Sequence, residues 1–153
     1  MNVPFVDLSK QYQSIKSEID FAMQSVIDDT AFIKGKYVKK FEHEFAHVNN
    51  ASHCISCANG TDAIFIVLKA LGIGPGDEVI TVANTWISTA ETITQTGAKA
   101  VFVDIDPRFY TIDVAKIEAQ ITSKTKAIIP VHLFGQPADM DSIVRICNEY
   151  NLF

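Results

Sequence analysis

The sequence predicts an α/β protein in which a mainly parallel sheet lies between two layers of helices. From residue 53 onward, short apolar runs of strand length alternate with stretches of helical periodicity. Clusters of Gly, Asp and Pro separate these units. Because parallel strands need crossover connections, usually helices, the alternation is typical of a three-layer α/β/α domain. We therefore expect residues 1–153 to form one domain or part of one.

Two amphipathic helices are expected before the alternating part. Apolar side chains recur every three or four residues in two stretches, as they do on one face of a helix. They are Ile15, Ile19, Met23, Val26 and Ile27 in the first stretch and Phe41, Phe45 and Val48 in the second. Gly35 lies in the break between the stretches. We expect the apolar positions of the second stretch to form a buried stripe.

Four strands and four helices are expected in the alternating part. The strands are predicted at residues 53–57, 78–82, 100–103 and 126–131. The helices are predicted at residues 61–71, 88–96, 114–121 and 140–150. Turn clusters at 72–77 and 104–107 separate these units. Since residues 151–153 read as the start of another strand, we expect the chain to be part of a longer domain.

The composition excludes several classes of protein. The formal charge of −5 and the two arginines, Arg108 and Arg145, provide no broad basic face for nucleic acid. No apolar run approaches the length of a membrane span, and residues 1–7 lack the pattern of an export signal. Three cysteines, an odd number, argue against a disulfide framework. We expect a cytoplasmic protein that does not contact membranes.

A candidate anion site follows the first predicted strand, where residues 59–62 read Asn-Gly-Thr-Asp. Gly60 would permit close approach of a phosphate to the backbone, and Thr61 would add a hydroxyl donor. The N-terminus of the following helix favours an anion through its free N–H groups and its dipole. The alternative is structural: Thr61 or Asp62 could simply cap the helix.

Trp86 and His132 are expected at the same edge of the sheet as Gly60, because each follows a predicted strand. An indole at this edge could stack on a planar cofactor, whereas ordinary burial in the core is the alternative for a lone tryptophan. His132, taken alone, is interpreted as a packed or capping residue.

A rival interpretation is a zinc hydrolase. His43, Glu44 and His47 match the H-E-x-x-H pattern on a predicted helix, in which both imidazoles bind zinc and the glutamate acts as general base. However, the two histidines fall on the face opposite Phe41 and Phe45, so we interpret them as part of a solvated surface and predict no metal site.

Cys54 and Cys57 form a single C-x-x-C motif within the first predicted strand. A zinc ribbon would need a second pair, and a redox site of the thioredoxin type would lie at the start of a helix. We therefore interpret both cysteines as small core residues.

Five collinear segments resemble the sugar-nucleotide aminotransferases named after DegT and StrS, which have the fold of aspartate aminotransferase. The segments are PFVDL at residues 4–8, CISCANGTDA at 54–63, GPGDEVI at 74–80, VDIDP at 103–107 and AIIPVHLFGQ at 127–136. The resemblance implies the N-terminal part of the large domain of a fold-type I transferase that depends on pyridoxal 5′-phosphate (PLP).

By this resemblance, Gly60 and Thr61 hold the cofactor phosphate and Trp86 stacks on its ring. The family moves an amino group, usually from glutamate, onto a keto group of a nucleotide-linked sugar, and its active site lies between the subunits of a homodimer. None of the eleven lysines matches the family's cofactor-binding lysine, so we assign no catalytic residue in this chain. A binding fragment without turnover remains an alternative.

Overall fold

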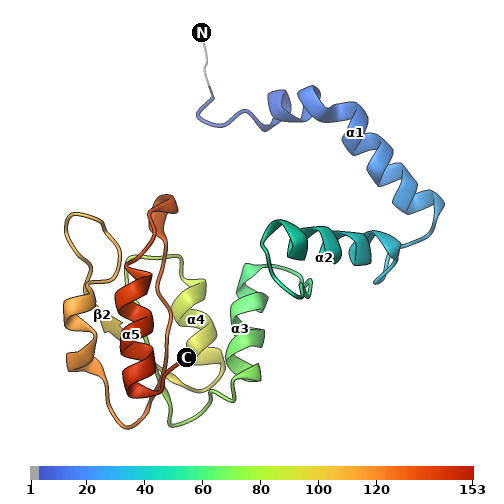
Figure 1. Cartoon of the computed structure of the whole chain (residues 1–153). Helices are drawn as coiled ribbons and strands as arrows, with labels where there is room; N and C mark the ends of the chain where they lie inside the picture. The colour runs from blue at the N-terminus through green and yellow to red at the C-terminus, as the bar shows by residue number, and fades with distance from the viewer. Residues whose placement is uncertain (1–3) are drawn as a thin grey trace. The chain divides into compact units, whose positions relative to one another are not determined.

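The structure is a computed structural model that describes residues 4–153 (Figure 1). The chain divides into two compact units, Met1–Ser56 and Cys57–Phe153. The first unit is helical and the second has the α/β architecture. Among the described residues, no helix is long and apolar enough to cross a membrane.

The first unit contains the two predicted helices, α1 (Leu8–Asp28) and α2 (Lys36–Val48). Asp7 caps α1 by accepting a hydrogen bond from the Lys10 N–H at 2.9 Å. Gly35 is the N-cap of α2, so the predicted break is confirmed. The Asp29 carboxylate lies between the two helices and pairs with Lys36 Nζ at 2.7 Å.

The buried stripe expected on α2 is wrong for this unit. Phe41 and Phe45 are about half exposed and Val48 is 81% exposed, whereas Ala46 is the buried residue of the helix. The two rings instead stack on each other with centroids 5.3 Å apart. The physical reason is that two helices alone offer no sheet or third layer to cover this apolar face.

The second unit is built on a parallel sheet with the strand order β2-β1-β3. The strands are β1 (Glu78–Val82), β2 (Lys99–Val103) and β3 (Thr125–Ile128). Ile80 pairs with Val101 on one side and with Ile128 on the other. Phe153 lies along the outer edge of β3, where its N–H donates to Lys126 O and its carbonyl accepts from the Ile128 N–H, both at 2.9 Å.

Helices cover both faces of this sheet, as predicted. The helices are α3 (Gly60–Ala70), α4 (Ser88–Gln95) and α5 (Met140–Tyr150). On one face Val79 and Ala127 pack with Leu68 of α3 and Ile93 of α4. On the other face Ile80, Val82, Val103 and Ile128 pack with Ile143 and Ile146 of α5. Alternate residues of each strand thus belong to different cores, and the three-layer arrangement is confirmed.

The helix predicted at residues 114–121 is wrong. Two short 3₁₀ helices replace it, η1 (Val114–Lys116) and η2 (Glu118–Gln120), and Ile117 between them is fully buried. The hydrogen bonds here join residues three apart, such as Gln120 N–H to Ile117 O at 2.9 Å. Because one fully buried residue, Ile117, holds this short crossover against the core, tight 3₁₀ turns are favoured over a regular helix. A third 3₁₀ helix, η3 (Leu133–Gly135), follows β3.

The strand predicted at residues 53–57 is also wrong. This segment is irregular, because no strand in the described part of the chain lies beside it to form a ladder. Ser56 is instead held by α2, since its N–H and its hydroxyl both donate to Glu42 Oε1, at 2.9 and 2.7 Å. The prediction that both cysteines are core residues fails with the strand, because Cys57 is exposed and Cys54 is half-buried.

Candidate functional site

The candidate site lies where α3 and α4 begin. Helix α4 starts after the carboxyl end of β1, and α3 ends shortly before β1 begins. Helix α3 therefore runs antiparallel to the strand and presents its N-terminus at the same edge of the sheet. A hydrogen bond between the first turns of the two helices confirms this placement, since Thr61 Oγ1 lies 2.7 Å from Ser88 Oγ. In an open α/β sheet this edge is the usual place for ligands.

Asn59 caps α3. Its backbone is extended, and its side-chain oxygen accepts a hydrogen bond from the Asp62 N–H at 2.9 Å. Its amide nitrogen also donates to the Asp62 carboxylate at 3.1 Å. The alternative in which Thr61 or Asp62 caps the helix is therefore wrong, and the Thr61 hydroxyl is available for other contacts.

The N–H groups of Gly60 and Thr61 complete the donor set at this helix end. Neither donates to an acceptor within residues 4–153. A Cβ atom built on Gly60 would meet no atom within 4 Å, so the space beside Gly60 is open. Two free N–H groups, one hydroxyl and a favourable dipole fit the oxygens of a phosphate group.

Trp86 lies two residues before α4 and is 78% exposed, which excludes the alternative that it belongs to the core. Its carbonyl accepts from the Thr89 N–H at 3.2 Å, and the Thr85 and Thr89 hydroxyls lie 3.3 Å apart, so the backbone that carries the indole is held in place. The exposed indole therefore provides a flat apolar surface near the start of α4.

His132 has a structural role, as interpreted from the sequence. Its Nδ1 accepts a hydrogen bond from the Ala138 N–H at 3.1 Å, which closes the loop between β3 and α5. An acceptor at Nδ1 leaves the proton of the neutral imidazole on Nε2.

Ser88 is the member of the site that sequence reasoning missed. It is buried, and its hydroxyl reaches Thr61 from 27 positions away along the chain. A serine at the start of a predicted helix reads as a cap, and only the packing of α3 against α4 gives it another partner.

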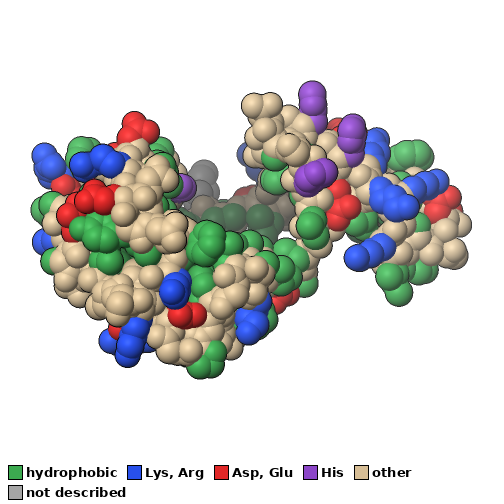
Figure 2. Space-filling model, turned by 60° about the horizontal axis from the view of Figure 1, so that its bottom comes forward, with side chains coloured by type: hydrophobic (Ala, Val, Ile, Leu, Met, Phe, Trp, Pro, Cys, Tyr) green, Lys and Arg blue, Asp and Glu red, His purple; other side chains and the backbone are tan. Residues whose placement is uncertain are grey.

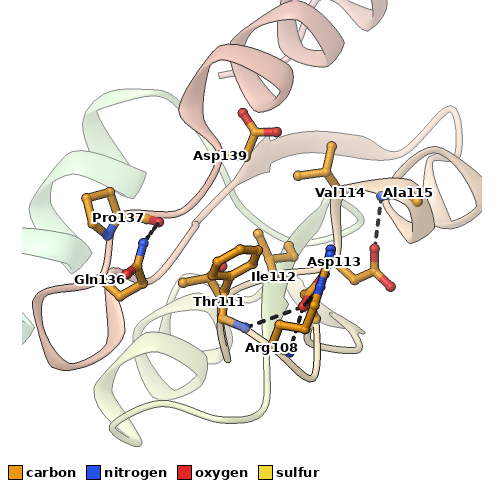
Figure 3. A pocket seen from close by; sticks show the side chains of 11 residues that line it. Arg108, Thr111, Ile112, Asp113, Val114, Ala115, Gln136, Pro137 and Asp139 are labelled. Carbon is orange, nitrogen blue, oxygen red and sulfur yellow. Dashed lines mark hydrogen bonds and ion pairs between the residues drawn. The ribbon is translucent and has the colours of Figure 1, made fainter.

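A separate cavity of about 340 Å³ lies between the loop that follows β2 and the segment that leads into α5 (Figure 3). Its charged groups are already occupied by neighbours. Arg108 pairs with Asp106 at 2.9 Å and holds the pKa of that carboxyl at about 2, Asp113 caps η1, and Asp139 caps α5. We therefore interpret this cavity as a structural feature between two loops rather than as a ligand site.

The fold and these residues together define a class: an α/β protein with a candidate anion site at a helix N-terminus and an exposed aromatic ring near the start of the next helix. The sequence model of the DegT/DnrJ/EryC1/StrS aminotransferase family matches residues 13–153, and the chain belongs to this family. The three-layer fold is accordingly that of the PLP-dependent aminotransferases to which it is similar.

Two relatives illustrate the similarity in sequence. The chain is 54% identical to the pleiotropic regulatory protein of Geobacillus stearothermophilus over 152 residues, 99% of this chain and 41% of that protein. It is 51% identical to the UDP-2-acetamido-2-deoxy-3-oxo-D-glucuronate aminotransferase of Pseudomonas aeruginosa, over 98% of this chain and 42% of that enzyme. The chain thus spans about two fifths of the length of these relatives.

Solved structures agree with this assignment. A DegT/DnrJ/EryC1/StrS aminotransferase from Brucella abortus matches with a TM-score of 0.95 and 37% identity, over 99% of this chain and 43% of that one. The NtdA protein of Bacillus subtilis, solved with the bound cofactor pyridoxamine phosphate, matches with a TM-score of 0.94 and 38% identity, over 99% of this chain and 35% of that one.

The zinc hydrolase alternative has no support. The family and the relatives named above are not described as zinc hydrolases. Residues 4–153 contain no group of three or more His, Cys, Asp or Glu side chains placed to hold a metal ion.

On the face that Figure 2 presents, basic side chains are interspersed with acidic and uncharged ones.

Proposed function

We propose that this chain supplies the phosphate-binding part of a PLP-dependent aminotransferase that converts a nucleotide-linked keto-sugar into an amino-sugar. The observation that carries the proposal is the N-terminus of α3, which offers two free N–H groups and the Thr61 hydroxyl, with open space beside Gly60. Membership of an aminotransferase family and a relative that acts on a UDP-linked keto-sugar support the choice of reaction.

In this proposal, Gly60 and Thr61 bind the cofactor phosphate through their N–H groups, and the Thr61 hydroxyl adds a third donor. The favourable end of the helix dipole adds about 0.3–1 kcal/mol. Gly60 matters because a larger side chain would extend into the open space that the phosphate needs. The Asn59 cap keeps this first turn of α3 in helical geometry.

Trp86 is proposed to fix the plane of the cofactor ring. Stacking on an exposed indole contributes about 0.5–1.5 kcal/mol beyond the burial of area, and it restricts rotation about the phosphate. Bound PLP would supply an electron sink for the transfer of the amino group. The residues of this chain would bind and orient it, and we assign no residue of the chain to a proton-transfer step.

The other features of the proposal concern the assembled protein. We infer that glutamate is the amino donor, that two copies associate as a homodimer, and that the protein works in the cytoplasm. Three free cysteines, Cys54, Cys57 and Cys147, support a reducing compartment. The second candidate is a module that binds the cofactor through the same donors at the N-terminus of α3 without turnover.

Calorimetric titration with pyridoxamine phosphate and with pyridoxamine tests the phosphate site, because the two ligands differ only in the phosphate. Neither carries an aldehyde that would label lysines at random. We expect the purified protein to prefer the phosphorylated ligand, and Gly60→Val to lose that preference while it stays folded, since the built Cβ clashes with nothing. Equal affinity for both ligands in the unsubstituted protein would contradict the proposed function.

Adding glutamate and a UDP-linked 3-keto sugar to the protein loaded with cofactor separates the two candidates. Formation of the amino-sugar supports the aminotransferase. Binding of pyridoxamine phosphate without amino-sugar supports the module that only binds the cofactor.

A further inference from the structure

The hydroxyl of Ser88 is buried, and its contact with the candidate phosphate site is the hydrogen bond to the Thr61 hydroxyl. Ser88 is the first residue of α4 and is 7% exposed. Its Oγ lies 2.7 Å from Thr61 Oγ1, and within residues 4–153 the Ser88 hydroxyl makes no other hydrogen bond. Thr61 is half-buried, so its hydroxyl lies between buried Ser88 and the open end of α3.

The direction of this hydrogen bond follows from the supply of acceptors. If Thr61 donated its proton to Ser88, the Ser88 proton would be buried with no acceptor in the described chain, which is unfavourable. If Ser88 donates to Thr61, both hydroxyls are satisfied, because the Thr61 proton can point toward solvent or a ligand. The second arrangement is therefore the stable one.

On this basis, we propose that Ser88 is a positioning residue that orients the Thr61 hydroxyl as a hydrogen-bond donor toward the bound phosphate. The inference rests on the proposed function and adds a residue to that site. A phosphate dianion only accepts hydrogen bonds, so a hydroxyl beside it must donate. Donation from Ser88 also polarises the Thr61 O–H and strengthens its bond to the anion.

A double-mutant cycle on the affinity for pyridoxamine phosphate tests this coupling. We expect Ser88→Ala to weaken binding roughly fivefold and Thr61→Val to weaken it roughly tenfold. Adding Ser88→Ala to Thr61→Val should change affinity by less than about twofold, because Ser88 acts only through the hydroxyl already removed. Affinity for pyridoxamine, which lacks the phosphate, should be the same in all four proteins.

Thr96→Val is the matched control. Thr96 is a buried residue at the other end of α4, and its hydroxyl donates to its own helix at Ile93 O, at 2.7 Å. Its removal should lower stability without changing the preference for the phosphorylated ligand. Thr61→Val probes the same pair from its more exposed side, so the cycle does not depend on one buried substitution.

Three results would overturn the inference and leave the proposed function standing: wild-type affinity in Ser88→Ala, equal losses for pyridoxamine and its phosphate, or additive effects in the double variant. A lack of preference for the phosphorylated ligand in the unsubstituted protein would instead contradict the phosphate site itself, and the role of Ser88 with it.

Discussion

We expect the side chain of Trp86 to matter for ligand binding rather than for folding. At 78% exposure it contributes little to the core of this chain, yet it lies two residues before Ser88. We expect Trp86→Ala to weaken binding of pyridoxamine phosphate roughly 3- to 10-fold, and Trp86→Phe to retain most of the affinity because it keeps a stacking face. Quantitative titration measures both.

Phe109→Ala serves as the control for Trp86, since Phe109 is a half-exposed aromatic residue that lines the separate cavity. Its removal should leave affinity unchanged. If Trp86→Ala and Phe109→Ala were indistinguishable in binding, the stacking role of Trp86 would be wrong.

Asp106 makes the stability of the second unit depend on pH. Arg108 lowers the pKa of the Asp106 carboxyl from 3.8 to about 2. Between these values the unfolded chain binds more protons than the folded one, so this contribution to stability is present above about pH 4 and is lost as the pH falls toward 2. We expect Asp106→Asn to reduce stability at pH 7 and to flatten its decline between pH 4 and 2.

Urea unfolding at several pH values measures this effect. Arg108→Gln removes the other partner and should flatten the same part of the profile. An unchanged slope below pH 4 in both variants would show that this ion pair does not contribute to acid unfolding.

At the scale of elements, the first turn of α3 combines a structural cap with the proposed phosphate site. Asn59→Ala should destabilise the protein by about 1 kcal/mol, because it removes the acceptor for the Asp62 N–H. Asn59→Asp should retain the acceptor for the Asp62 N–H, but it replaces the donor to the Asp62 carboxylate with a like charge. We therefore expect it to lose part of the stability and to weaken binding of pyridoxamine phosphate by repulsion. Chemical denaturation and titration, applied to the same variants, separate the two roles.

Asn148→Ala is a suitable control for the cap, since Asn148 is exposed within α5 and alanine is the better helix former. It should be neutral or slightly stabilising. Loss of phosphate affinity in Asn59→Asp no greater than that in Asn148→Ala would argue against an anion beside residue 59.

The elements that were predicted correctly are those whose partners lie within the chain. The run at Glu78–Val82 forms β1 because β2 and β3 lie on both sides of it, and Met140–Tyr150 forms α5 because Ile143 and Ile146 face the sheet. The run at 53–57 has strand composition but no neighbouring strand within residues 4–153, so it stays irregular. Composition indicates which secondary structure a segment can form, and pairing with neighbouring strands decides whether a strand forms.

The candidate site was predictable in part for the same reason. Trp86 follows β1, as predicted, whereas Gly60 and Thr61 follow a run that forms no strand. Their place at the same edge as Trp86 was predicted from that missing strand and is shown instead by the contact between Thr61 and Ser88. The role of Asn59 as the cap depends on local dihedral angles, and the contact between Thr61 and Ser88 depends on the packing of α3 against α4. Neither can be read from spacing alone.

At the scale of the whole molecule, the second unit places its donors at one edge of a sheet held by cores on both faces. Val79 and Ile80 are neighbours in β1 but belong to different cores, which fixes the strand against rotation. Both α3 and α4 start from this sheet edge. The rigid sheet thus aligns two helix N-termini, and our central claim is that one of them, that of α3, binds the cofactor phosphate.

A crystal structure of the protein grown with pyridoxamine phosphate tests that claim most directly. We expect phosphate oxygens within roughly 2.7–3.2 Å of the Gly60 and Thr61 N–H nitrogens and of Thr61 Oγ1, with the ring against the Trp86 indole. Phosphate bound instead in the cavity lined by Arg108 and Gln136, or ligand bound with no contact to the first turn of α3, would contradict the account.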